Sequence, residues 1–149
     1  MPQMPKFIIH TDGGSRNNPG PAAIGVVISN EKGQVLKEFG EYLGIATNNE
    51  AEYKAAIFAL KKIKSLWGKE AAKSAEVQVF ADSELLVKQL NGEYKIEHPN
   101  IQPLFLQIWN LKIDFKKVSF SSIPREKNKE ADRLVNEALD AQGKAKRLF

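Results

Sequence analysis

The chain has 149 residues, of which 42% are hydrophobic and 27% charged, as in an ordinary globular domain. It contains no cysteine, which excludes disulfides, thiolate zinc sites and cysteine nucleophiles, and no apolar run approaches the 18 residues of a membrane-spanning helix. A net charge of +4 favours a polyanionic partner, such as nucleic acid, and the absence of cysteine leads us to expect a cytoplasmic protein without a membrane partner.

Three strands are predicted in the first third of the chain. The apolar run Phe7-Ile8-Ile9 indicates a strand over residues 6–12, and apolar residues return at 22–30 and again at 34–43. The turn sequence NEKG joins the second and third strands, and connections this short favour an antiparallel meander.

The hydrophobic period then changes to that of a helix. Thr47 and Glu50 have the spacing of a capping box, and Gly68 is a typical helix stop, so we expect a helix between them. Its apolar residues recur at nearly helical spacing: Ala55, Ala59, Ile63 and Leu66.

The rest of the chain alternates strands with helices. Strands are predicted at 76–82 and 117–123, and helices at 83–92, 100–115 and 128–143. The order predicts an α/β fold with one five-stranded mixed sheet, three meander strands antiparallel and two parallel, flanked by helices. We expect a single domain over 1–149, with a flexible N-terminus at 1–5 and a basic C-terminal tail at 143–149.

Four acidic residues occupy positions where an acid needs an explanation. Asp12 and Asp82 end predicted strands, whereas Glu52 and Asp132 lie in the first turns of predicted helices. Taken singly, the helix acids could be dipole partners and Asp82 could be a helix cap. Asp12 is harder to explain in this way, because two glycines follow it and no helix begins there.

If the first and fourth strands are parallel neighbours, the four carboxylates converge at one edge of the sheet. Carboxylates this close repel one another unless cations lie among them. Oxygen-only ligands suit Mg²⁺, or Mn²⁺ in its place, and two such ions about 4 Å apart are the usual arrangement for attack on a phosphodiester. We therefore expect a metal ion as the positive partner of Asp12.

The motifs around these acids resemble those of type 1 ribonuclease H, in the family's order and spacing, from about residue 6 to 141. The matching segments are TDGGSRNNPGPAAIGVV, ATNNEAEYKAAIFAL, VFADSELLVKQLNGEYKI and IPREKNKEADRLVNEAL. The resemblance implies that Asp12, Glu52, Asp82 and Asp132 bind two Mg²⁺ ions. It also implies an endonuclease that cuts the RNA strand of an RNA–DNA hybrid, leaving a 3′-hydroxyl and a 5′-phosphate, and we expect a monomer.

The resemblance also implies a set of substrate contacts. Amides and close backbone approach suit recognition of the 2′-hydroxyl, which both donates and accepts hydrogen bonds. Thr47 could bind a DNA-strand phosphate as well as cap its helix, and turn formation is the alternative role of the asparagines. The expected contacts are Gly13, Gly14, Asn18, Thr47, Asn48, Asn49 and Glu84.

The chain departs from the family pattern in two ways. Many relatives carry a histidine on the loop before the last helix, where this chain has Ser122, so that Arg125 or Lys127 could replace part of its role. The chain resembles the compact form, without a separate hybrid-binding domain or a lysine-rich insertion. We expect the tail to help hold the duplex through Lys144, Lys146 and Arg147.

Other functions stay open at this point. The same fold is found in transposases, integrases, resolvases and exonucleases, so the fold alone does not choose among nucleases. A catalytically silent hybrid-binding module and a detached polymerase domain are further alternatives. The presence of all four acids disfavours the silent module.

Overall fold

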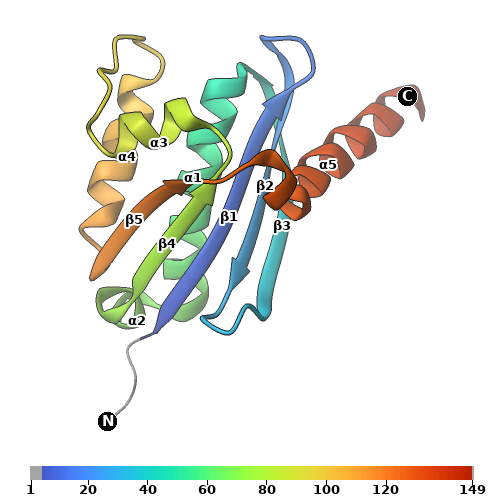
Figure 1. Cartoon of the computed structure of the whole chain (residues 1–149). Helices are drawn as coiled ribbons and strands as arrows, with labels where there is room; N and C mark the ends of the chain where they lie inside the picture. Colours follow the sequence, from blue (N-terminus) through green and yellow to red (C-terminus); the bar gives the residue numbers. More distant parts are fainter. Residues whose placement is uncertain (1–4, 149) are drawn as a thin grey trace.

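The computed structural model describes residues 5–148, with side chains described as far as residue 145, so all but the last residue of the N-terminal segment predicted as flexible lies outside the described part. Its centre is a five-stranded sheet in the order β3-β2-β1-β4-β5 (Figure 1). β1 pairs with β2, and β2 with β3, in antiparallel fashion, whereas β1–β4 and β4–β5 are parallel. This arrangement confirms the predicted mixed sheet. The strands are β1 Lys6–Ser15, β2 Gly20–Ser29, β3 Val35–Ala46, β4 Glu76–Ala81 and β5 Lys117–Ser122.

Helices cover both faces of this sheet (Figure 1). α1 lies against β1 and β2 on one face, where α4 also packs on it, and α5 lies against β2 and β3 on the other. The helices are α1 Asn48–Trp67, α2 Lys69–Ser74, α3 Glu84–Leu90, α4 Gln102–Lys112 and α5 Lys129–Leu148, with a 3₁₀ turn η1 at Arg125–Lys127. Among residues 5–148, none of the helices is long and apolar enough to span a membrane.

The main core lies between the sheet and α1. Alternate residues of β1 and β4, such as Ile9 and Val79, point toward α1, which contributes Tyr53 and Leu60. A smaller apolar cluster under α5 includes Ala23, Val135 and Leu139. The alternation along β1 therefore places odd-numbered residues toward α1 and even-numbered residues toward the other face.

Gly25 of β2 allows α5 to approach the sheet closely. A Cβ atom at Gly25 would overlap the carbonyl oxygen of Ala131 and would lie 3.2 Å from the Cβ of Leu134. The first turns of α5 can therefore lie directly on the strand backbone, which brings this helix to the same edge of the sheet as the end of β1.

The structure corrects several of the predicted bounds. β1 continues past its predicted end at Asp12 to Ser15, so Asp12 lies within the strand, one residue beyond the part that pairs with β4. α5 continues through Gly143 to Leu148, so residues 143–148 of the segment predicted as a basic tail are the last part of a helix that projects past the sheet in Figure 1. A glycine inside a helix costs only about 1 kcal/mol, and the Lys, Ala and Arg residues that follow are good helix formers. The short helix α2 was not predicted, because six residues are too few to show a period.

The expected start and end of α1 are confirmed. The Thr47 side chain accepts a hydrogen bond from the backbone N–H of Glu50, and the Glu50 side chain accepts one from the backbone N–H of Thr47. At the other end, Gly68 has a positive φ of 92° and donates its N–H to the carbonyl of Lys64. The cap fixes the first turns of α1, and with them the position of Glu52.

Candidate functional site

Three of the predicted acids meet at the carboxyl ends of the two central strands. Asp12 and Asp82 each follow a residue of the parallel β1–β4 pair, in which Thr11 is aligned with Ala81. Glu52 reaches the same place from α1. One carboxylate oxygen from each of the three acids lies within 4.8 Å of the others. The register of two parallel strands and one helix start thus forms the cluster.

Gly13 explains how Glu52 comes so near to Asp12. A Cβ atom at Gly13 would lie 2.5 Å from the backbone nitrogen of Glu52 and would overlap the backbone of Ala51. Only glycine lets α1 rest on β1 at this point. The absence of a side chain at Gly13 therefore serves packing within the protein, in addition to any contact with substrate. A Cβ at Gly14 would have no neighbour closer than 3.8 Å.

The position of Asp12 disfavours a negative charge. Burial raises the pKa of its carboxyl, and the charges of Asp82, Asp132 and Glu52 raise it further, to about 8. The N–H of Gly13 donates to Asp12 Oδ1 over 3.0 Å and offsets part of this rise. Without a cation, the cluster therefore holds a proton at neutral pH.

Glu52 shows the same effect to a lesser degree. Burial raises the pKa of its carboxyl to about 7, with a further contribution from the charge of Asp82. The Ser83 hydroxyl and the nearby Arg125 guanidinium act in the opposite direction. Arg125 is therefore close enough to the cluster to interact with it electrostatically.

The donor set fits a hard divalent cation. The three converging groups offer only carboxylate oxygens, which are the ligands that Mg²⁺ and Mn²⁺ prefer. A bound cation would also stabilise the ionised form of Asp12 and Glu52, whose burial disfavours it.

Asn128 orients one of these acids, and the sequence interpretation did not include it in the site. Its side chain is 1% exposed, and its Nδ2 donates to Asp82 Oδ2 and to the Thr11 carbonyl, each over 2.9 Å. One amide thus ties the start of α5 to the ends of both central strands. The available signal was a single asparagine at the start of a predicted helix, which by itself indicates a cap.

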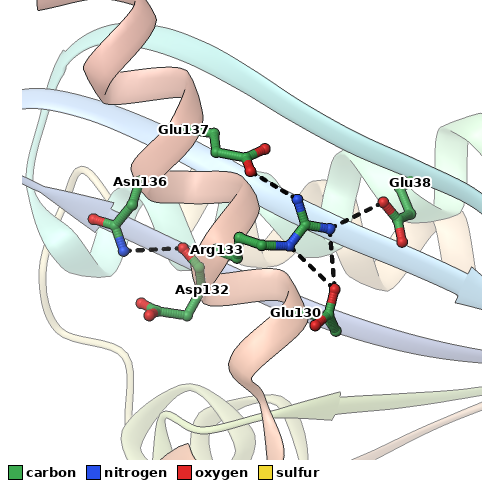
Figure 2. A network of polar contacts seen from close by, with 6 residues as sticks. All are labelled: Glu38, Glu130, Asp132, Arg133, Asn136 and Glu137. Carbon is green, nitrogen blue, oxygen red and sulfur yellow. Dashed lines mark hydrogen bonds and ion pairs between the residues drawn. The ribbon is translucent and has the colours of Figure 1, made fainter.

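Asp132 lies outside the three-acid cluster but lines the same pocket. Figure 2 shows its carboxylate turned away from the neighbouring Arg133, whose guanidinium instead bonds Glu38 of β3 over 3.2 Å. Glu130 and Glu137, on the adjacent turns of α5, accept further bonds from Arg133 over 3.0 and 2.8 Å. This network fixes α5 against β3 and leaves Asp132 free of a cationic partner in the network.

The acids border a pocket of about 360 Å³ between the end of β1, the start of α1 and one side of α5. Its walls combine carboxylates, two arginines, amides and small residues. The lining residues are Asp12, Gly13, Gly14, Ser15, Arg16, Asn48, Glu52, Asp82, Arg125, Asp132, Val135, Asn136 and Leu139. The predicted four acids, both glycines, Asn48 and Arg125 therefore share one cavity.

Comparison with known proteins identifies the family. Residues 10–138 match the family model described as reverse transcriptase-like. A crystal structure of LC11-RNase H1 in complex with an RNA/DNA hybrid is 47% identical, with a TM-score of 0.87, and the match covers 91% of this chain and 98% of that one. The chain belongs to the ribonuclease H family. The family expected from the motifs is thereby confirmed.

Other members of the family support the same assignment. Ribonuclease HI of Halobacterium salinarum is 39% identical over 132 residues, which are 87% of this chain and 62% of that protein. A bifunctional protein of Mycobacterium tuberculosis is 41% identical over 137 residues, which are 91% of this chain. The chain spans about a third of the length of that relative, 36%.

Within this ribonuclease H fold, two of the three predicted amides, Asn18 and Asn48, form hydrogen bonds beside the pocket. The side chain of Asn48 accepts the N–H of Ser15 over 2.8 Å, and Asn18 accepts the backbone N–H of Asn48 over 3.0 Å. Asn49 has a buried side-chain oxygen without a hydrogen-bond partner among the described residues. Asn18 and Asn48 therefore join the β1–β2 loop to α1, and their contact with substrate stays a prediction.

The remaining predicted residues lie farther out on the ribonuclease H fold. Glu84 is exposed at the first position of α3, and Ser122 is exposed at the end of β5. Lys127 lines a different cavity, between η1, the start of α5 and strands β1 to β3. Lys144 is exposed on α5, whereas the side chains of Lys146 and Arg147 lie outside the described part of the chain. Their roles stay predictions.

Proposed function

We propose that this chain is an endonuclease that hydrolyses the RNA strand of an RNA–DNA hybrid, leaving a 3′-hydroxyl and a 5′-phosphate. The observation that carries the proposal is the cluster of Asp12, Glu52 and Asp82, with ligand oxygens within 4.8 Å, on the wall of an open pocket. The 47% identical LC11-RNase H1, described in complex with an RNA/DNA hybrid, supports the choice of substrate.

The acids would hold two divalent cations, Mg²⁺ or Mn²⁺. Asp12, Glu52 and Asp82 present their oxygens to a common centre, and Asp132 adds a further carboxylate that lines the same pocket. Bound there, the ions would supply the positive charge that activates water and stabilises the leaving oxygen of a phosphodiester. Asn128 would keep the Asp82 carboxylate in its ligating orientation through the bond to Oδ2.

The chain's other residues would bind and orient the hybrid. Gly14, Ser15 and Asn48 border the pocket, and their backbone and amide groups can meet a ribose hydroxyl, which both donates and accepts. Arg125 borders the pocket beside Glu52 and offers a cation near the reacting phosphate. We expect the protein to act as a monomer in the cytoplasm.

The test is cleavage of end-labelled substrates of one sequence: hybrid, RNA duplex, DNA duplex and single-stranded RNA, with Mg²⁺ or with chelator. Cleavage confined to the RNA of the hybrid, dependent on metal and absent in Asp12→Asn, is the expected result. Ligation or phosphatase treatment of the products identifies the end groups. Equal cutting of DNA duplex, or full activity in chelator, would contradict the proposal.

A further inference from the structure

The guanidinium of Arg16 places a positive charge on the wall of the acidic pocket. Binding of metal ions by the carboxylates does not explain why a cation lies there. Arg16 directly follows the last residue of β1 and lines the same cavity as Asp12 and Asp132. Its Nη2 donates to Asp140 Oδ1 over 2.7 Å, and Asp140 lies on α5, 124 residues away in sequence. The pair bridges the β1–β2 loop and α5 beside the pocket.

The backbone of Arg16 is held from both sides. Its N–H donates to the Pro21 carbonyl over 2.9 Å, which closes the loop, and the preceding Ser15 N–H donates to Asn48 Oδ1 over 2.8 Å. The guanidinium therefore extends from a fixed point of the chain. Within residues 5–145, Asp140 is its one side-chain partner, so the other N–H groups can meet a ligand.

The ion pair itself explains little of the stability of the fold. The side chains of Arg16 and Asp140 are 49% and 60% exposed. Exposed pairs of this kind contribute at most about 1 kcal/mol. The pair can, however, direct the planar guanidinium, whose fork of donors matches the oxygens of a phosphate.

Resting on the function proposed above, we propose that Arg16 is a substrate-binding residue that holds a phosphate of the cleaved strand next to the scissile one. In the proposed function, the cations held by the carboxylates neutralise the charge of the scissile phosphate. The next phosphate of the same strand brings another negative charge into a pocket whose walls carry four carboxylates. A cation on that wall, already oriented by Asp140, offsets this repulsion.

Asp140→Asn is a matched control for Arg16→Ala, because both variants break the same ion pair and only one removes the cation. Steady-state cleavage of the hybrid by the full chain should show KM raised about tenfold in Arg16→Ala, with kcat within about twofold of the parent. In Asp140→Asn, KM should rise clearly less than in Arg16→Ala, because the cation stays while its orienting carboxylate is lost. Arg16→Lys should fall between, since it keeps the charge and loses the fork.

The salt dependence gives an independent measurement. Loss of one phosphate contact should reduce the slope of log(kcat/KM) against log salt by about 0.7 to 0.9 in Arg16→Ala. Lys73→Ala, an exposed cation on α2 outside the pocket-lining residues, controls for net charge and should keep the parental slope.

A neutral methylphosphonate linkage identifies the phosphate. Placed beside the cut in the RNA strand, it should raise KM for the parent and leave Arg16→Ala almost unaffected, because the two changes remove the same contact. Additive effects at the linkages on both sides of the cut would overturn the proposal. So would equal losses in Arg16→Ala and Asp140→Asn, which would indicate a purely structural pair.

The behaviour of the parent enzyme distinguishes a failure of the Arg16 proposal from a failure of the proposed function. A parent that cleaves the hybrid, together with an Arg16→Ala variant of parental KM and salt slope, overturns the role of Arg16 alone. A parent that neither binds nor cleaves the hybrid overturns the proposed function, and this inference with it.

Discussion

Asp12→Asn should stabilise the metal-free protein while abolishing cleavage. The variant keeps the shape of the side chain and an Oδ1 that can accept the Gly13 N–H, which lies 3.0 Å away in the parent. It removes the charge that burial and three neighbouring carboxylates disfavour. Activity is lost because one oxygen ligand of the proposed metal site loses its charge.

The size of the stabilisation follows from the pKa of Asp12. The folded protein raises this pKa from 3.8 to about 8, so the folded state binds the proton more tightly than the unfolded chain. Stability is therefore lost as pH rises from about 4 to about 8, and the loss is complete above about 8. At about 1.4 kcal/mol per pKa unit, the upper limit of this loss is near 6 kcal/mol.

Local relaxation and water access reduce that limit, and we expect Asp12→Asn to be about 1 to 3 kcal/mol more stable at high pH. For a chain of this length, the melting temperature should rise by roughly 3–10 °C at pH 8. The difference should shrink toward zero near pH 4, where the parent carboxyl is protonated in the folded protein. Thermal unfolding in chelator, followed by circular dichroism between pH 4 and 8, measures this.

Glu93→Gln is the control, because it removes one negative charge from an exposed loop residue. Its melting temperature should follow the parent at every pH. Added Mg²⁺ should raise the melting temperature of the parent, since the ion binds the folded state, and should raise that of Asp12→Asn less. An Asp12→Asn variant that melts at or below the parent at pH 8 would refute the repulsion argument.

Three further predictions concern neighbouring elements. Asn128→Ala removes two bonds of 2.9 Å and leaves the buried Thr11 carbonyl without this partner, so the free energy of unfolding should fall by about 1–3 kcal/mol. Its activity should also require more Mg²⁺ for half-saturation, because Asp82 loses its orienting donor, and an unchanged metal titration would contradict this role. Ser122→His should raise kcat and add a titration near pH 6.5 to the pH–rate profile, whereas superimposable profiles would exclude a proton-transfer role for this loop position. Deletion of residues 144–149 should raise KM and flatten its salt dependence, and an unchanged salt slope would argue against duplex contacts by the end of α5.

The sequence by itself determined most of the elements and the identity of the acidic cluster. The capping box that places Glu52 near a helix start, and the strand ends predicted at Asp12 and Asp82, are patterns read within a few residues, although β1 itself continues past Asp12 to Ser15. Their convergence followed because the ends of adjacent parallel strands share one edge of a sheet. Short-range sequence patterns and the rule that adjacent parallel strands end at the same edge of a sheet were sufficient to predict the acidic cluster.

Only the tertiary structure decided how the cluster is supported. Whether Gly13 faces a nucleic acid or the backbone of Ala51 depends on the distance between β1 and α1, which the local pattern does not contain. Asn128 bonds residues 46 and 117 positions away, and Arg16 meets Asp140 across 124 positions, so both contacts depend on sheet register and on the rotation of α5. Similarly, α5 continues through Gly143, because the weak helix preference of one glycine is outweighed by the helix formers around it. Contacts between residues far apart in sequence are set by packing, and packing is fixed only when all the elements are in place.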